Sequence, residues 1–249
     1  MRLTLLRINR IPFTGGVITL SSSLKHLLEK NKLTLIVSLP ENRWDLAKVA
    51  MQAGVDAIKL HVNVDHRASG NHFGPVHAYD EVFRSIREEF SGPLGIVPGG
   101  SFEHIKQSEM DQIIDLGFNF YSVYAHQKPS WMVQLDSIEK TFAITNEYPF
   151  SQLGQVKHLG VSALEASIIP GEEYGSPLTF KDILAYNALV QNVDVPVLVP
   201  SQRKIETFDV PLLYRTGIKA IMLGAIVVGH TEESIKAAIS SFREAIESL

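Results

Sequence analysis

The pattern that most constrains the fold lies between Val195 and His230. Two short, continuous apolar runs, Pro196–Pro200 and Ile218–Leu223, flank an amphipathic helical stretch at Asp209–Arg215. Continuous β-branched runs are typical of parallel strands that are buried on both faces. Small or polar residues follow each run, so backbone N–H groups from both strand ends should lie at one shared edge of the sheet. This βαβ unit indicates an α/β protein.

The same alternation of strand and helix continues upstream. Six further apolar runs predict strands at Leu33–Pro40, Ala57–Asn63, Pro93–Pro98, Phe118–Ala125, Lys140–Thr145 and Ala163–Ile169. Helices are expected at Trp44–Ala53, Tyr79–Phe90, Ser101–Leu116, Pro129–Ser137, Ser151–Leu159 and Thr179–Gln191, and after Thr231. Eight strands that alternate with helices predict a parallel (β/α)8 TIM barrel. The sequence has no G-x-G-x-x-G turn, which disfavours a dinucleotide-binding sheet.

The length of 249 residues is that of one such barrel, and no stretch has the composition of a linker. We therefore expect a single domain, 1–249, in which 1–30 form an N-terminal addition and 33–249 form the barrel. The addition is expected to hold a hairpin, Arg2–Ile8 and Val17–Leu20, and a helix that begins near Ser21–Ser23 and ends near Lys30. It would plug the bottom of the barrel or contact a second copy, and we expect a homodimer.

Composition excludes several classes of function. The formal net charge of −4 argues against nucleic acid or an anionic membrane as the main partner. The absence of cysteine excludes disulfides, thiolate nucleophiles and cysteine-based metal sites. No apolar run reaches the roughly 18 residues that span a bilayer. The first ten residues are too charged for a signal peptide. These features predict a soluble, cytoplasmic protein.

Polar residues at the carboxyl ends of the predicted strands are the informative ones, because active sites of such barrels lie there. The two-residue period of a strand places Lys59, His61 and Asn63 on one face of their strand. Glu165 and Ser167 share one face of another strand. Since a lysine inside a barrel is costly unless it is paired, we expect Lys59 and Glu165 to meet across the barrel. Such a pair is either purely structural or part of an active site.

Two further strand ends carry candidate residues. The segment Y-S-V-Y-A-H-Q ends at His126, and a histidine at the rim is a plausible acid–base group because its ordinary pKa is near neutrality. Thr145 and Glu147 lie near the rim after the next strand. The segment P-G-E-E-Y-G-S-P-L-T follows Ile169, and its glycines allow a ligand to approach the backbone closely. For His126 and Glu147 the alternative is a solvated loop residue, and for the last segment it is an ordinary Gly/Pro turn.

The loop between His61 and His77 is rich in histidine. It also contains Asp65, His66, Arg67 and His72. Histidine and aspartate are metal ligands, so a divalent cation is one explanation. Their spacing matches no known metal motif, and a substrate lid with Arg67 for anionic groups explains the loop as well. We therefore assign no metal site and no resident cofactor.

Several stretches resemble one family of barrels. They are L-I-V-S-L-P, A-G-V-D-A-I-K-L, L-E-A-S-I-I-P-G-E-E-Y-G-S-P-L-T and G-I-K-A-I-M-L-G-A-I-V. Together they resemble the phosphate-binding TIM barrels of the ribulose-phosphate-binding superfamily, and within it the N-acylmannosamine-6-phosphate 2-epimerases. The resemblance spans most of residues 33–229. It implies a phosphorylated small-molecule substrate whose phosphate is held by the loops after the last three strands.

The chain departs from the epimerases at two strand ends. The third predicted strand, L-G-I-V-P-G-G, lacks the lysine that the epimerases carry there, and the seventh ends in V-P-S-Q instead of a glutamate and a glycine. The specific epimerisation is therefore not carried over, and Lys59 is our conjectured replacement for the missing lysine. The residues expected to bind substrate or phosphate are Ser38, Asn63, Gly171, Gly175, Ser201, Gln202, Gly224 and Ala225.

The sequence thus favours an isomerase or epimerase that moves a proton next to the carbonyl of a sugar phosphate. Glu165 would be the base, Lys59 would stabilise the enolate, and His61 or His126 would be the acid. A carbon–carbon lyase with Lys59 as Schiff-base nucleophile is the alternative enzyme. A barrel that binds a phosphorylated metabolite without turnover is the third hypothesis, because a scaffold can keep its phosphate site after its chemistry has gone.

Overall fold

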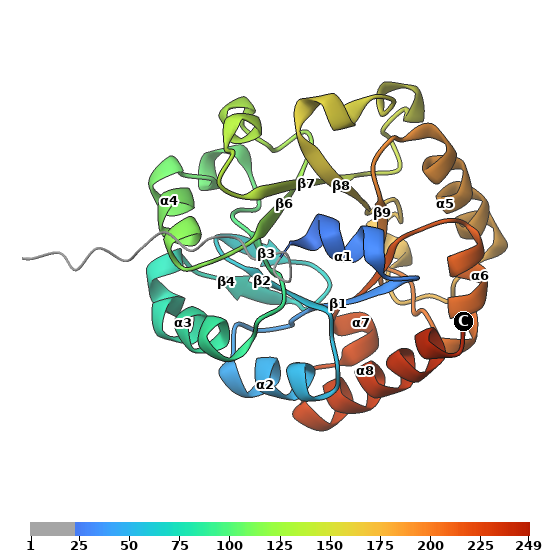
Figure 1. The fold of residues 1–249 in the computed structure, drawn as a ribbon, viewed down its shortest axis with the longest axis horizontal. Coiled ribbons are helices and arrows are strands. Elements are labelled where there is room, and N and C mark those ends of the chain that lie inside the picture. The colour runs from blue at the N-terminus through green and yellow to red at the C-terminus, as the bar shows by residue number, and fades with distance from the viewer. Residues whose placement is uncertain (1–22) are drawn as a thin grey trace, which may run out of the picture.

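The computed structural model describes residues 23–249, so the hairpin predicted at Arg2–Ile8 and Val17–Leu20 lies outside the described residues. Eight parallel strands close into a barrel, and helices cover its outer face (Figure 1). The predicted TIM barrel is therefore confirmed. Among the described residues, no helix is both long and apolar enough to cross a bilayer.

The strands follow one another around the barrel in the closed order β1-β10-β9-β8-β7-β6-β5-β2. Each is short and almost wholly buried, which is why the sequence shows eight brief apolar runs. Their bounds are β1 Thr34–Ser38, β2 Ala57–His61, β5 Leu94–Val97, β6 Phe120–Tyr124, β7 Glu139–Ile144, β8 Val161–Ala166, β9 Val197–Pro200 and β10 Ala220–Leu223.

The outer layer is helical but uneven. Its α-helices are α2 Trp44–Gln52, α3 Asp80–Glu89, α4 Gln107–Asp115, α5 Phe180–Asn192, α6 Val210–Arg215, α7 Ala225–Val228 and α8 Glu232–Glu247. The helices predicted at Pro129–Ser137 and Ser151–Leu159 are wrong, since these segments form the short 3₁₀ helices η4 Ser130–Gln134, η5 Phe150–Gln152 and η6 Val156–Leu159. The second segment is broken where Gln155 adopts a left-handed conformation, with φ of 66°, directly after Gly154.

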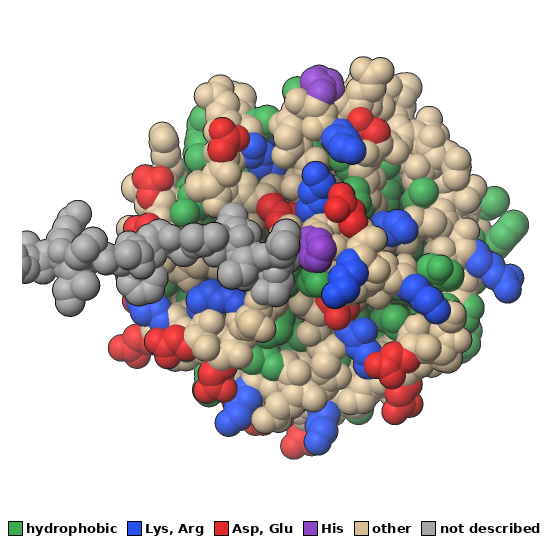
Figure 2. Space-filling model, viewed as in Figure 1, with side chains coloured by type: hydrophobic (Ala, Val, Ile, Leu, Met, Phe, Trp, Pro, Cys, Tyr) green, Lys and Arg blue, Asp and Glu red, His purple; other side chains and the backbone are tan. Residues whose placement is uncertain are grey.

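The helix α1, Leu24–Lys30, closes the amino-terminal end of the barrel (Figure 1). Ser23 caps it by accepting a hydrogen bond from the backbone N–H of His26. Leu24 and Leu28 are fully buried and pack with the inward-facing apolar side chains of the strands, which include Phe120 and Met222. This helix therefore plugs the amino-terminal end, whereas the role expected for the preceding hairpin lies outside the described residues. Around α1, acidic and basic side chains are interspersed on the surface of this face (Figure 2).

The apolar layer inside the barrel depends on one glycine. A Cβ at Gly95 would lie 2.1 Å from the ring of Phe120, so the ring can fill the barrel only because β5 carries a glycine there. The result is a dry layer of side chains between α1 and the carboxyl-terminal half of the barrel. Polar side chains that enter the barrel from the other end are therefore solvated from that end alone.

The segment Val64–Ala78, which we expected to be a loop, contains a two-stranded hairpin. Its strands are β3, Val64–His66, and β4, Asn71–Phe73, which pair in antiparallel register. Gly70 turns the chain between them, with a φ of +71°. The hairpin follows β2 and therefore lies at the carboxyl-terminal end of the barrel.

Candidate active site

An open cavity of about 450 Å³ lies at the carboxyl-terminal end of the barrel. All eight strands contribute to its wall through inward-facing residues, which are Ser38, Lys59, Val97, Ser122, Ala143, Glu165, Pro200 and Met222. The hairpin β3–β4 and the loop after β8 form part of its mouth. A cavity in this place and of this size is where enzymes with this fold bind their substrates.

The floor of the cavity is an ion pair between Lys59 and Glu165. Lys59 Nζ lies 3.1 Å from Glu165 Oε1 and 3.0 Å from Oε2, and only 5% of Lys59 and 8% of Glu165 are exposed. The closed order places β8 four strands from β2 in either direction, so the two strands face each other across the barrel. Alternate strands fill the same layer of a barrel, which brings these two side chains to one level. The meeting expected from the sequence is present.

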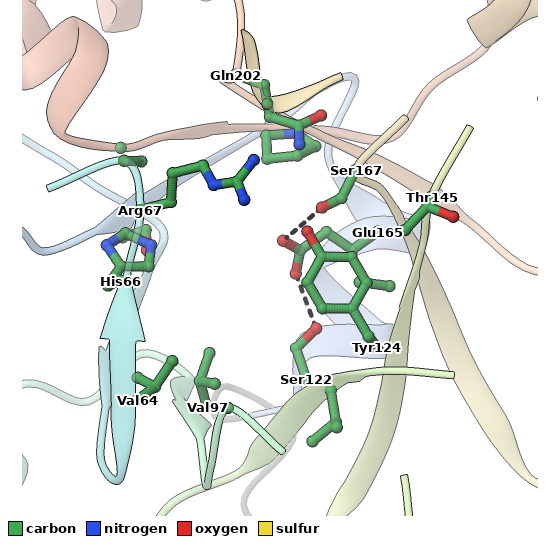
Figure 3. A pocket seen from close by; sticks show the side chains of 18 of the residues that line it. Val64, His66, Arg67, Val97, Ser122, Tyr124, Thr145, Glu165, Ser167 and Gln202 are labelled. Atoms are coloured by element: carbon green, nitrogen blue, oxygen red, sulfur yellow. Dashed lines mark hydrogen bonds between the residues drawn. The ribbon is translucent and has the colours of Figure 1, made fainter. Parts of the chain in front are cut away.

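Two serines complete the surroundings of the Glu165 carboxylate. Ser122 Oγ donates to Oε2 over 2.8 Å, and Ser167 Oγ donates to Oε1 over 3.3 Å (Figure 3). With the two bonds from Lys59, each oxygen accepts two hydrogen bonds, which is close to the capacity of a carboxylate. Glu165 can therefore accept a proton only if one donor moves away, and the longest of these bonds is the one from Ser167.

His61 lies beside this pair but is fully buried. Its Nε2 is 3.3 Å from Ser38 Oγ, while its Nδ1 has no hydrogen-bond partner among the described residues. The rings of His66 and Phe73 pack against it, with centroids 4.3 Å and 4.8 Å away. Burial lowers the pKa of His61 well below its ordinary value, and the charges of His66 and Lys59 add to this. Its imidazole is therefore neutral at neutral pH and is no source of an imidazolium proton.

His126, the other predicted acid, lies at the exposed mouth of the cavity, where its ring is 5.5 Å from that of Tyr124. Tyr124 was not among the predicted site residues, yet it lines the cavity and its ring stands beside Glu165 (Figure 3). Burial raises the pKa of Tyr124, so the phenol stays protonated at neutral pH. Its parity with Ser122 on β6 was the available signal in the sequence.

His66 is a second cavity residue that was not among the predicted catalytic residues. It lines the cavity from β3, and its Nδ1 lies 2.9 Å from Ser69 Oγ. Burial, assisted by the charge of Lys59, lowers the pKa of His66 to about 4. Its position over His61 depends on the hairpin, for which the sequence pattern carried no signal.

Four of the residues expected at the phosphate line the cavity near the ends of β8, β9 and β10. They are Gly171, Ser201, Gln202 and Gly224. Gly224 N–H donates to Ser201 Oγ over 2.7 Å. Gln202 Oε1 accepts from the backbone N–H of Ile169, and Gln202 Nε2 donates to the hydroxyl of Tyr174. These bonds fix the rim of the cavity. Ser38 also lines the cavity, on β1 beside His61.

Three other predicted residues do not line the cavity. Asn63 has a left-handed φ of 53°, which ends the strand alternation and turns its amide toward Glu109 Oε2, 2.6 Å away. Gly175 has a φ of +80°, and its N–H donates to the carbonyl of Gln202. It therefore turns the loop after β8 and ties it to the end of β9. Ala225 is buried as the first residue of α7.

The histidine-rich loop gathers no metal ligands. Within residues 23–249, no three histidine, aspartate or glutamate side chains are arranged to hold a metal ion. On the exposed side of the hairpin, His72 Nδ1 lies 2.7 Å from Asp65 Oδ1.

Comparison with known proteins shows the fold. The sequence matches no protein-family model and no curated protein. Among solved structures, thiamine phosphate pyrophosphorylase from Pyrococcus furiosus is 14% identical, with a TM-score of 0.60 over 88% of this chain and 97% of that chain. The tryptophan synthase A-subunit from the same organism is 13% identical, with a TM-score of 0.65 over 86% and 99%. KGPDC from Streptococcus mutans is 14% identical, with a TM-score of 0.63 over 88% and 99%.

These structures share the barrel fold of this chain, so the resemblance expected from the sequence holds at the level of the fold, and membership of the ribulose-phosphate-binding superfamily stays a prediction. At such low identity, the similarity shows the fold and leaves the chemistry open. The closer likeness to N-acylmannosamine-6-phosphate 2-epimerases stays a prediction.

The buried ion pair yields a prediction for stability. Lys59→Met or Glu165→Gln alone leaves one buried charge without its partner, which should lower the free energy of unfolding by about 3–5 kcal/mol. The double variant removes both charges and should lose clearly less than the sum of the two single losses. Urea denaturation at neutral pH measures this. The exposed pair Arg84–Asp80 is the control, for which each neutral variant should lose no more than about 1 kcal/mol. Additive losses at Lys59 and Glu165 would show that the two charges do not interact.

The buried histidines predict a dependence of stability on pH. His66 has a pKa of about 4 in the folded state against an ordinary value of 6.5, and the pKa of His61 is also lowered, so the unfolded chain binds more protons within this window. Stability should therefore fall as the pH falls from about 6.5 toward 4, by up to about 1.4 kcal/mol per pH unit for each imidazole. Urea denaturation at a series of pH values should show a shallower slope for His66→Phe and an unchanged slope for the exposed control His158→Gln. A slope unchanged by His66→Phe would contradict the assignment.

Proposed function

We propose that this protein is an enzyme that moves a proton next to the carbonyl of a small phosphorylated substrate, as an isomerase or epimerase does. The observation that carries the proposal is the Lys59–Glu165 pair at the floor of an open cavity. Removing two charges from water is costly, and replacing a buried pair by apolar residues often stabilises a protein. A chain that needed only to fold or to bind would gain little from such a pair beneath its cavity.

The geometry supports separate roles for the two charged groups. Glu165 is the proposed base, because a carboxylate can take a proton from the carbon next to a carbonyl. Lys59 is the proposed stabiliser of the enolate, since an ammonium at the same level offers a positive charge where negative charge develops on the oxygen. A substrate that displaces the bond from Ser167 would free one lone pair of Glu165 for the proton.

Two groups are proposed to return the proton. Tyr124 keeps its phenolic proton at neutral pH because burial raises its pKa, and its ring stands beside Glu165. His126 lies at the mouth of the cavity, next to Tyr124. We favour these over His61, whose neutral imidazole contacts Ser38 and is fully buried. The acid is thus proposed to act from β6 and the base from β8.

The proposed position of the phosphate is the rim formed by Gly171, Ser201, Gln202 and Gly224. Two observations support a phosphorylated ligand there. These residues line the cavity at the ends of the last three strands, where the fold commonly binds phosphate. In addition, one structural neighbour is named for thiamine phosphate. The side chains of Ser201 and Gln202 also give this rim polar groups that suit an anionic ligand.

The alternative enzyme is a lyase that forms a Schiff base through Lys59. A Schiff-base lyase needs Lys59 as a neutral amine, whereas its Nζ lies within 3.1 Å of both oxygens of Glu165, so no feature of the site favours it.

A homodimer and a cytoplasmic location also stay predictions. Exposed apolar side chains on and next to α5 and α6 offer a surface for a second copy, and they include Phe180, Leu184 and Phe208.

The proposal predicts exchange of a substrate hydrogen with solvent. Phosphorylated aldoses and ketoses are first screened for a rise in melting temperature, and each hit is then incubated with the protein in deuterated water. NMR should show deuterium next to the carbonyl with the wild type. Glu165→Gln should slow this exchange about 100-fold or more, because the general base is lost. Glu147→Gln is the matched control, since this glutamate is exposed and does not line the cavity, and it should exchange at the wild-type rate.

The same incubation separates the three hypotheses. A borohydride-trapped adduct on Lys59, together with cleavage of the substrate, would replace the isomerase by the lyase. Tight binding of a hit with neither exchange nor cleavage would overturn both enzymes and leave a binding protein.

A further inference from the structure

Arg67 brings an uncompensated positive charge to the cavity. The Asp, Glu, Lys and Arg side chains that line it are Lys59, Asp65, Arg67 and Glu165. Lys59 and Glu165 neutralise each other, and Asp65 is 90% exposed in its side chain and contacts His72 on the outer side of the hairpin. Arg67 has no carboxylate within 4.0 Å among residues 23–249. Apart from its histidines, the cavity therefore has one cation that no described acidic group balances.

The guanidinium of Arg67 reaches from the hairpin to the opposite rim. A Cβ at Gly171 would lie 1.4 Å from Arg67 Nη1, so the guanidinium rests directly on the backbone of the loop after β8. Its central carbon lies 6.0 Å from the centre of the Tyr174 ring. The side chain points into the cavity on the side of Gln202 (Figure 3). Arg67 thus reaches the rim proposed for the phosphate.

The hairpin that carries Arg67 is braced at its base. Phe73 is buried against His61, and Asn71 Nδ2 donates to the carbonyl of Pro40 over 2.8 Å. Val64 packs so closely on Gly100 that a Cβ there would lie 2.8 Å from Val64 Cγ2. Ordering a long side chain on a braced turn costs less entropy at the moment of binding than ordering a mobile loop. The hairpin therefore holds the backbone of Arg67 in place, while its side chain is exposed at the mouth of the cavity.

The loop on the other side is braced by a different arginine. Arg203 is buried, and its guanidinium forms ion pairs with Asp182 and Glu173, which lies in the same loop as Gly171 and Tyr174. Arg203 thus helps to hold that loop through its ion pair with Glu173. The contrast is informative, because Arg67 lies against the same loop without any carboxylate, as a residue that binds an external anion would.

We propose that Arg67 is the substrate-recognition residue that supplies the counter-charge for a phosphate monoester at the rim next to Gly171. This inference rests on the proposed function for the chemical nature of the ligand. The guanidinium offers paired N–H donors whose geometry matches two phosphate oxygens, and the backbone of Gly171 allows the anion and the guanidinium to lie close together. A carboxylate shares this chemistry but carries one charge, so phosphate should bind more tightly.

The test is a titration of the whole 249-residue chain with inorganic phosphate. NMR monitors the binding, at low and at moderate ionic strength. Arg67→Met should weaken binding at least tenfold and reduce its salt dependence, and Arg67→Lys should restore part of the affinity. Gly171→Ala should also weaken binding, because the added Cβ takes the place of Arg67 Nη1. In the Arg67→Met background, Gly171→Ala should have little further effect. Arg84→Met removes the same charge from the surface as a control and should bind phosphate like the wild type.

A purely structural contact between Arg67 and Tyr174 would lower the melting temperature of Arg67→Met without changing the affinity for phosphate, and this result would overturn the proposal. Failure of the wild type to bind phosphate, or binding of acetate as tightly as phosphate, would overturn it too. The deuterium-exchange experiment tests the proposed isomerase independently of phosphate binding. Phosphate binding that depends on Arg67, with no exchange in any substrate, would sustain this inference while the proposed isomerase fails.

Discussion

The ion pair between Lys59 and Glu165 is the interaction on which the rest of the site depends. The two residues are 106 positions apart, and only closure of the barrel brings β2 and β8 face to face. Once they face each other, the free energy of burying each charge depends on the other. Ser122 of β6 and Ser167, which directly follows β8, then satisfy the remaining lone pairs of the carboxylate.

The apolar layer below the pair leaves the site open only at the carboxyl-terminal end of the barrel. Phe120, which Gly95 admits into the barrel, and the leucines of α1 close the amino-terminal half. Water and substrate can then reach the charges only from the carboxyl-terminal end. At that end the hairpin buries His61 and His66, and burial lowers the pKa of both, so that they are neutral. The hairpin also leaves Arg67 as a cation directed at an incoming ligand.

Sequence periodicity was sufficient for the barrel and for its central pair, and it failed for features that depend on tertiary contacts. Lys59 and Glu165 could be paired because strand alternation and the order of the strands decide which side chains face inward. Asn63 broke that rule through a left-handed backbone, which no periodic pattern shows. The hairpin β3–β4 has strands of only three residues with mixed polarity, so it carried no signal. The contact of Arg67 with Gly171 joins segments about a hundred residues apart, and the sequence of neither segment predicts it.

The most direct test of the whole account is a crystal structure with a phosphorylated sugar acid that lacks an exchangeable hydrogen next to a carbonyl. We expect its phosphate to contact Arg67 and the rim at Gly171 and Gly224, and its carbon chain to cover Lys59 and Glu165 after displacing the hydroxyl of Ser167. A ligand that binds outside this cavity, or whose carbon chain turns away from an undisturbed ion pair, would contradict the claim that the pair is the centre of the chemistry.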